Sequence, residues 1–139
     1  MTSPEEIPPL PVRGLRHLAL RVTDLSKSRR FYEGVLGMKP VWAPDPENLY
    51  LSLGSDNLAL HQIPAGERLA KEGSPLDHFG LIAENEAAVD LIARRMEEAG
   101  VPILKPVKRH RDGSYSFYMA DPDGNSIQIL YEPNISPIR

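Results

Sequence analysis

The chain has 139 residues and a net charge of −3; 41% of its residues are hydrophobic and 25% are charged. A chain of this length is expected to form one domain with its own hydrophobic core. Its charges of both signs are scattered, without the basic stripe that nucleic acids bind. It has no apolar run of about 18 residues and no secretory signal, so we expect a cytoplasmic protein that binds neither nucleic acid nor membrane.

Cysteine is absent from the sequence. The chain therefore has no disulfide, no thiolate nucleophile and no cysteine-based zinc site. Any metal ion must be bound by nitrogen and oxygen ligands.

Residues 1–13 contain four prolines and no sustained hydrophobic periodicity, which is typical of an extended arm. The domain itself is expected over residues 14–133. Residues 134–139 are then a C-terminal tail.

The first half of the domain, about residues 15–63, has the pattern of a strand, a helix and three further strands. Apolar and polar residues alternate over residues 15–22, which predicts a half-buried strand. Asp24 or Ser26 can cap a helix, and Gly37 can end it in the left-handed conformation. Three strands are then predicted, at residues 38–42, 49–53 and 58–62.

The same pattern starts again after a polar crossing segment at residues 64–75. A strand that begins at His78 is followed by a helix that Asn85 can cap and Gly100 can end, and a strand near residues 102–106 comes next. This second module covers about residues 76–131. The repeat predicts an α+β fold in which two modules build one curved mixed sheet with helices on its outer face.

The segment from His110 to Gln128 is predicted to form two strands around a tight turn. Residues 121–125, Asp-Pro-Asp-Gly-Asn, supply a proline with a preset φ and a glycine that is free to adopt a positive φ. Strand alternation places Ser116 and Tyr118 on one face, and Gln128 on the corresponding face of the next strand. If the apolar faces meet a core, these polar side chains point into whatever the opposite face encloses.

These motifs resemble the vicinal oxygen chelate superfamily, which includes glyoxalase I, bleomycin and fosfomycin resistance proteins, and type I extradiol dioxygenases. The resemblance covers about residues 15–131. It implies paired βαβββ modules that form a cup around a divalent metal ion. The positions that carry it are His17, Phe31-Tyr32, Leu36-Gly37-Met38, His78 and Asp121-Pro122-Asp123-Gly124.

The resemblance also implies a set of site residues. Metal ligands in the superfamily lie on the first, fifth and last strands, which carries over to His17, His78 and Gln128. Within the superfamily, the segment from His110 to Gln128 closely resembles the signature of ring-cleaving extradiol dioxygenases, although Gln128 stands where that family has a ligand glutamate. By the same resemblance, the catalytic residues around the substrate are His61, His110 and Tyr118.

Such residues suit metal-dependent chemistry. Two imidazoles and one oxygen ligand leave open positions on a metal ion for a bidentate substrate. An amide ligand keeps the oxygen donor but lacks the negative charge of a carboxylate, so we expect weaker metal binding and a more electrophilic metal ion. The expected metal is Fe(II) or Mn(II), with Zn, Ni or Mg as alternatives.

Three functions are compatible with this pattern. The first is an oxygenase that acts on a catechol or another vicinal oxygen chelator. The second is a metal-dependent lyase, isomerase or transferase of the glyoxalase or fosfomycin-resistance type, in which Arg111, Ser116 and Lys108 bind an anionic substrate. The third is a metal-free binding protein similar to the bleomycin-resistance proteins, in which Gln128 marks a lost metal site. In each case the partner is a small molecule.

Structural interpretations compete with these assignments. A single strand histidine such as His17 is more often a hydrogen-bonded structural residue than a ligand, and His61 could simply face solvent. Trp42, Tyr50 and Phe79 are expected to pack in the core. A homodimer is expected, with the cup formed either within one chain or by exchanged modules.

Overall fold

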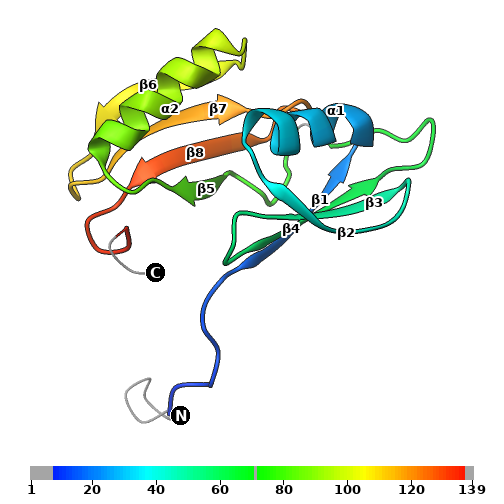
Figure 1. Ribbon diagram of the computed structural model, residues 1–139, viewed down its shortest axis with the longest axis horizontal. Coiled ribbons are helices and arrows are strands. Elements are labelled where there is room, and N and C mark those ends of the chain that lie inside the picture. The colour runs from blue at the N-terminus through cyan, green and yellow to red at the C-terminus, as the bar shows by residue number, and fades with distance from the viewer. Residues whose placement is uncertain (1–7, 71, 137–139) are drawn as a thin grey trace.

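The computed structural model describes residues 8–70 and 72–136 (Figure 1). The expected arm and tail therefore lie partly outside the described residues. Residues 8–16 form neither helix nor strand, so the first strand begins two residues later than the sequence predicts. Within the described part of the chain, no helix is long and apolar enough to cross a membrane.

The first module forms a four-stranded sheet with one distorted helix. Asp24 caps the helix by accepting a hydrogen bond from the backbone N–H of Lys27, and Gly37 follows its end with a φ of 77°. The sheet order is β1-β4-β3-β2, and only the β1–β4 pair is parallel. Its elements are β1 (His17–Val22), α1 (Leu25–Arg29), the π-helix η2 (Arg30–Val35), β2 (Lys39–Asp45), β3 (Asn48–Ser52) and β4 (Asn57–Gln62).

The second module repeats this topology with a regular helix. Asn85 caps the helix by accepting from the backbone N–H of Ala88, and Gly100 follows its end with a φ of 76°. The sheet order is β5-β8-β7-β6, with a parallel β5–β8 pair. Its elements are β5 (Phe79–Ile82), α2 (Glu86–Glu98), β6 (Ile103–Arg109), β7 (Tyr115–Ala120) and β8 (Ser126–Tyr131).

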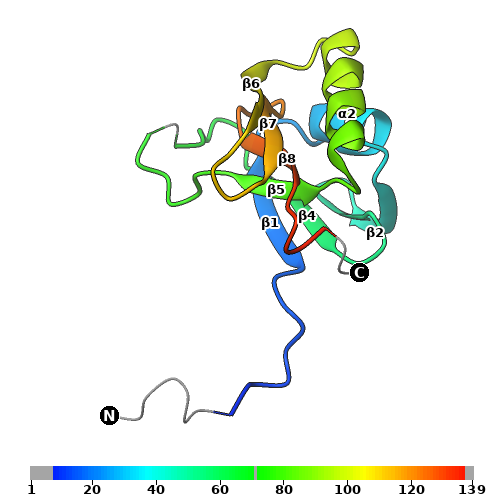
Figure 2. The same ribbon diagram turned by 90° about the vertical axis from the view of Figure 1, so that its left-hand side faces the viewer.

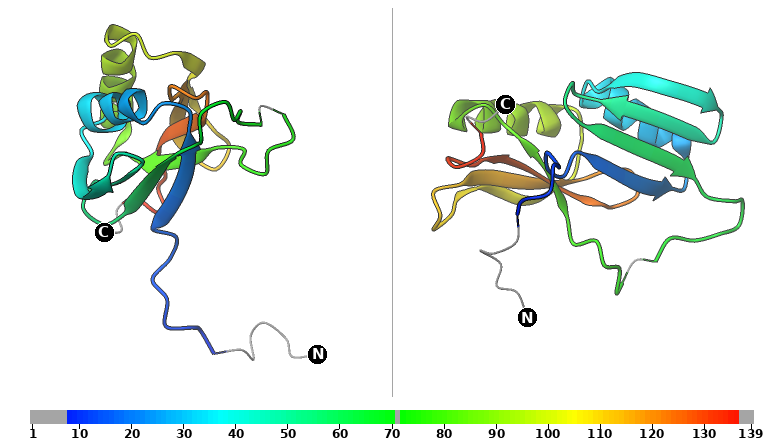
Figure 3. Two further views of the ribbon diagram at one scale, coloured as in Figure 1. Left: turned by 90° about the vertical axis from the view of Figure 1, so that its right-hand side faces the viewer. Right: turned by 90° about the horizontal axis from the view of Figure 1, so that it is seen from below.

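The predicted α+β class and the paired βαβββ modules are confirmed. The strands divide between two four-stranded sheets, and the helices of both modules lie above these sheets in Figure 1, an arrangement that Figure 2 shows from the side. One hydrophobic cluster joins residues of both modules between helices and sheets. Among the described residues, no helix covers the opposite faces of the sheets, which the right-hand view of Figure 3 shows from below. We call these the open faces.

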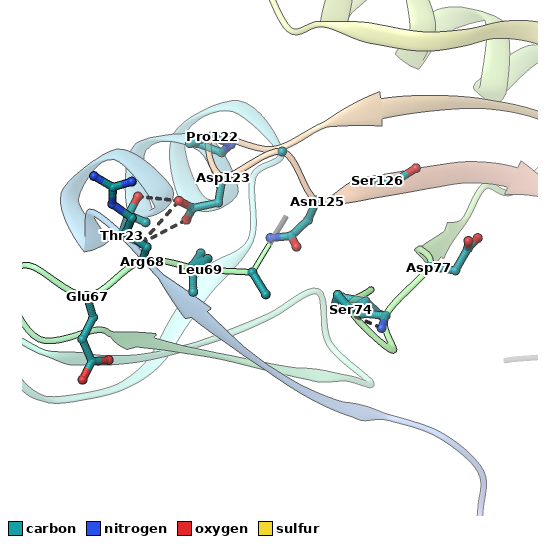
Figure 4. A pocket seen from close by; sticks show the side chains of 13 residues that line it. Thr23, Glu67, Arg68, Leu69, Ser74, Asp77, Pro122, Asp123, Asn125 and Ser126 are labelled. Carbon is teal, nitrogen blue, oxygen red and sulfur yellow. Dashed lines mark hydrogen bonds between the residues drawn. The ribbon is translucent and has the colours of Figure 1, made fainter. Parts of the chain in front are cut away.

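A buried contact connects the two modules. The Tyr32 hydroxyl, on η2, donates a 2.5 Å hydrogen bond to the Asp121 carboxylate, and both residues are buried. Next to it, the backbone N–H and the hydroxyl of Thr23 both donate to the Asp123 carboxylate, as Figure 4 shows. Residues 121–125 thus form the turn that the sequence predicts, and the turn also binds the first module to the second.

The expectation that Trp42 and Tyr50 pack in the core is wrong, since neither belongs to the core cluster. Trp42 is the more exposed of the two. Its side chain is 59% exposed, and its ring lies 4.9 Å from the ring of Tyr50. The reason is its position on β2, an edge strand that contains Pro40 and Pro44 and pairs irregularly with β3. Phe79, in contrast, packs against the core cluster as predicted.

Candidate metal and substrate site

The open face of the second sheet carries polar side chains because strand alternation sends the apolar ones into the core. The four apolar residues Phe117, Met119, Ile127 and Ile129 are almost completely buried. Tyr118 and Gln128, which pair across β7 and β8, therefore share the open face. The His78 ring lies 5.3 Å from the Tyr118 ring, nearly perpendicular to it.

Gly80 allows a close approach of a neighbouring side chain on this face. It pairs with Gln128 across β5 and β8, and a Cβ atom at this position would lie 3.0 Å from the side chain of Leu130. The bare backbone of Gly80 therefore lets the side chain of Leu130 pack closely against it, next to Gln128.

Two lysines of β6 extend the same face. Lys105 pairs with Tyr118 and Lys108 with Ser116, and the register shifts between the two pairs. The Lys105 Nζ atom lies 4.9 Å from the centre of the Tyr118 ring, in cation–π geometry. Sequence reasoning missed Lys105, because strict alternation places it and Lys108 on opposite faces. Pro106, inside the strand, was the available signal of an irregularity.

Three predicted site residues are linked by hydrogen bonds. The Ser116 hydroxyl accepts a 3.0 Å hydrogen bond from Nε2 of Gln128 and lies 2.8 Å from Nε2 of His110. Ser116 is 1% exposed. A buried hydroxyl therefore holds the side chains of His110 and Gln128.

The other three histidines share one mode of attachment. Each is bound through Nδ1 to a side-chain oxygen: His17 to Asn57 at 2.8 Å, His61 to Asn48 at 2.6 Å, and His78 to Asp77 at 2.6 Å. When Nδ1 carries the proton and donates it to such an oxygen, Nε2 keeps a lone pair. That nitrogen can bind a metal ion or accept a proton.

A cavity of about 480 Å³ brings the predicted metal ligands together. His17 of β1, Gln128 of β8 and His78, which directly precedes β5, all line it. Among the described residues, no group of three His, Cys, Asp or Glu side chains could hold a metal ion. A third protein ligand beside His17 and His78 would therefore have to be an uncharged donor such as Gln128, or come from a second copy of the chain.

A larger cavity, of about 1080 Å³, lies between the crossing segment and the turn at residues 121–125 (Figure 4). None of the predicted site residues lines it. The Asp123 carboxylate at its wall is already bonded to Thr23. We therefore place the candidate site at the smaller cavity and on the open face around Gln128.

The basic run from Lys108 to Arg111 is divided between different surroundings. Arg109 forms an ion pair with Glu86 at the start of α2 and lowers the pKa of that carboxyl group. Arg111 is exposed in the turn that follows β6. In that turn, the hydrogen bond from the Ser114 hydroxyl lowers the pKa of Asp112. Of this run, Lys108 is the cation that cross-strand pairing assigns to the open face, and the role of Arg111 stays a prediction.

Comparison with known proteins supports the same architecture. The model of the Glyoxalase/Bleomycin resistance protein/Dioxygenase superfamily matches residues 14–129. Glutathione transferase FosA of Serratia marcescens is 30% identical, over 85% of this chain and 80% of its own. The 2,2',3-trihydroxybiphenyl dioxygenase of Sphingomonas paucimobilis is 27% identical, over 84% of this chain and 40% of its own.

A solved structure agrees with these matches. The lactoylglutathione lyase of Agrobacterium tumefaciens superposes with a TM-score of 0.71 and 26% identity, covering 88% of this chain and 96% of its own. The relatives thus include both a glutathione transferase and a dioxygenase, and they do not single out the dioxygenases that the segment from His110 to Gln128 resembles. The chain belongs to the glyoxalase, bleomycin resistance protein and dioxygenase superfamily.

Proposed function

We propose that the protein is a divalent-metal-dependent enzyme that acts on a small anionic substrate with two neighbouring oxygens. The observation that carries this proposal is the attachment of His17 and His78 through Nδ1, which leaves Nε2 of both free beside the same cavity. With the amide oxygen of Gln128, these atoms form a set of two nitrogens and one oxygen that fits Fe(II) or Mn(II), and also Zn, Ni or Mg.

The protein side chains have separable tasks in this proposal. A metal ion bound by the three ligands would polarise the chelating oxygens of the substrate. Lys105 and Lys108 supply positive charge for its anionic group. Tyr118, next to His78, can hydrogen-bond a substrate oxygen on which negative charge develops.

His61 is the candidate base. Its Nδ1 is held by Asn48, and its ring packs edge-on against Tyr50 at 5.9 Å. The free Nε2 can therefore accept a proton in a fixed orientation. His110 and Arg111 stay further candidates, for acid–base chemistry and anion binding respectively.

We infer that the reaction is the addition of a thiol to an electrophilic carbon next to the chelated oxygens. Three neutral ligands leave the full double positive charge on a metal ion, which favours polarisation of bound oxygens over the loss of an electron to O₂. The similarity to a glutathione transferase supports the same class. In the addition, the sulfur bonds to carbon, and the proton released from the thiol goes to the oxygen that gains negative charge.

Extradiol ring cleavage is the second candidate. It is favoured by the order of His110, between β6 and β7, Tyr118 on β7 and Gln128 on β8, and by the similarity to a trihydroxybiphenyl dioxygenase. Glutathione with an anionic electrophile, and catechols with oxygen uptake, separate the two reactions.

Metal binding is the first test. Protein purified without an affinity metal column is analysed for metal content and titrated anaerobically with Fe(II) and Mn(II). We expect about one metal ion per chain, with binding lost in His17→Ala and in His78→Ala and retained in the control His61→Ala. Gln128→Glu should bind metal more tightly, because a carboxylate adds negative charge. Absence of metal binding in the unsubstituted protein would leave the metal-free binding protein as the better model.

We also propose a homodimer, which the superfamily commonly forms, with either arrangement of the cup. Mixing His17→Ala and His78→Ala proteins distinguishes them. If modules are exchanged between subunits, a mixed dimer contains one intact pair of histidines and recovers metal binding. If each cup lies within one chain, mixing recovers nothing.

A further inference from the structure

The buried hydroxyl of Ser116 lies between two side chains of the candidate site. It accepts from Nε2 of Gln128 and lies 2.8 Å from Nε2 of His110. Because Ser116 is 1% exposed, water has little access to its hydroxyl hydrogen. Within the described residues, the nitrogen within reach that can accept that hydrogen is Nε2 of His110.

This arrangement gives the hydrogen bonds a direction. The Gln128 amide donates to Ser116, and the Ser116 hydroxyl can in turn donate to Nε2 of His110 when that nitrogen carries no proton. The His110 ring then carries its proton on Nδ1. The amide nitrogen of Gln128 is occupied by Ser116, so its Oε1 atom is the free end of the side chain.

We propose that Ser116, held in turn by His110, is a positioning residue that fixes the amide of Gln128 with its oxygen available to a ligand in the cavity. The inference rests on the proposed function for the identity of that ligand as a metal ion. Under this proposal Gln128 binds a ligand, whereas the alternative interpretation treats it as the mark of a lost metal site. The Ser116 hydroxyl complements an uncharged amide, since it accepts from the amide nitrogen, and a carboxylate has no hydrogen to donate.

A glutamate at this position would reverse the order of donors. Its carboxylate can only accept, so the Ser116 hydroxyl would turn from His110 toward Glu. The only hydrogen then available between Ser116 and His110 is one on Nε2 of the ring. Gln128→Glu is therefore expected to shift the His110 proton from Nδ1 to Nε2.

The first experiment measures the hydrogen bonds without metal. The chain has four histidines, so long-range ¹⁵N NMR of labelled imidazoles resolves each ring, and His110→Asn assigns the one in question. At about pH 8, where an ordinary imidazole is neutral, we expect His110 to be protonated on Nδ1 in the unsubstituted protein and on Nε2 in Gln128→Glu. In Ser116→Ala, Nε2 loses its donor and the Gln128 side-chain NH₂ exchanges faster with water.

Ser114→Ala is the matched control. Ser114 is also a buried serine, and its hydroxyl donates to Asp112 instead of a site residue. This variant should leave the His110 signals and the Gln128 amide exchange unchanged. A His110 ring protonated on Nε2 in the unsubstituted protein, or a Gln128 amide whose exchange ignores Ser116→Ala, overturns the proposal.

The second experiment connects the positioning to the metal. Mn(II) titration followed by electron paramagnetic resonance should show binding weakened about tenfold by Ser116→Ala, the effect typical of residues that orient a ligand. In a Gln128→Ala background, Ser116→Ala should have no further effect. An equal loss in both backgrounds means that Ser116 does not act through Gln128 and contradicts the proposal.

The two experiments distinguish a failure of the metal-dependent function from a failure of the positioning role. If the unsubstituted protein binds no Mn(II), the metal-dependent function is overturned, and the orientation of Gln128 is decided by the NMR measurements alone. If metal binds as expected but Ser116→Ala leaves the affinity and the NMR signals unchanged, the positioning role is overturned and the function stands.

Discussion

The helices of the two modules differ although the modules share one topology. In the second module, α2 is a regular helix of 13 residues, tied to its own sheet by the hydrogen bond from Tyr115 to Asp90 and the ion pair of Arg109 with Glu86. In the first module, α1 has only five residues and continues as a π-helix. Its buried Tyr32 bonds to Asp121, in the other module.

The difference has a physical cause. The backbone N–H of Leu36 donates to the carbonyl of Phe31, five residues earlier, which widens the last turn of the helix. The widened turn contains Phe31 and Tyr32 as two successive buried residues. One helix of the repeat therefore serves to join the modules, and the other covers its own sheet.

The largest expected effect comes from breaking the hydrogen bond between Tyr32 and Asp121, which joins the two modules. Tyr32→Phe removes a donor from the buried Asp121 carboxylate, and we expect it to lower the free energy of unfolding by about 2 kcal/mol, since bonds to charged groups are the stronger ones. Urea denaturation followed by circular dichroism measures the change. Tyr131→Phe, at a partly buried tyrosine without a side-chain hydrogen bond among the described residues, is the control; an equal loss there would contradict the assignment.

The same contact between Tyr32 and Asp121 predicts that the stability of the protein falls at alkaline pH. Burial, and then the neighbouring Asp121, raises the pKa of Tyr32 well above its ordinary value. The folded protein thus holds this proton more strongly than the unfolded chain, so the stability is fully present below about pH 10 and falls as the pH rises further. Tyr32→Phe should make this alkaline fall shallower. A fall of unchanged steepness in that variant would show that other groups cause it.

Removing the buried hydroxyl of Ser28 from α1 should have a smaller and opposite effect on the free energy of unfolding. Ser28 is completely buried in α1, and its hydroxyl has no hydrogen-bond partner among the described residues. Ser28→Ala is expected to raise the free energy of unfolding by about 1 kcal/mol, because it removes the desolvation cost of the hydroxyl. The exposed Ser26→Ala in the same helix controls for helix propensity. A destabilised Ser28→Ala would indicate that the methyl packing or an unseen partner of the hydroxyl matters more.

The smallest expected effect comes from removing the ion pair of α2, the helix that covers its own sheet. The hydrogen bond from Arg109 lowers the pKa of Glu86, so this pair contributes stability above the ordinary carboxyl pKa, and the contribution is lost as the pH falls through the lowered value. Because both groups are solvent-exposed, we expect Glu86→Gln to shift the melting temperature less than Tyr32→Phe, and only above about pH 4. A shift of the melting temperature of equal size at low pH would show that the effect of Glu86→Gln is not electrostatic.

Local signals predicted much of this fold. Asp24 and Asn85 cap the helices, and Gly37 and Gly100 follow their ends, because caps depend on a few adjacent residues. The π-helix was not predictable in the same way. Its hydrogen bonds accompany a contact between Tyr32 and Asp121, which are 89 positions apart in the sequence.

In the candidate site, too, local signals predicted some features, and features that depend on distant contacts were missed. Alternation correctly placed Tyr118 and Gln128 on the face opposite the core. It missed Lys105 because a register shift in β6 breaks the alternation, and the hydrogen bonds of Ser116 depend on which side chains meet across strands. The metal ligands, catalytic residues and substrate contacts stay predictions that the proposed titrations address.

Trp42 gives the protein an optical probe of its own. It is the only tryptophan in the chain, and in the folded state it is already 59% exposed, stacked on Tyr50 at the open face of the first sheet. Its emission should therefore change little when the chain unfolds in denaturant. A ligand or a second subunit that covers this face would remove water from the indole and move the emission to shorter wavelength. Tryptophan fluorescence of this protein is thus a measure of occupancy and a poor measure of unfolding.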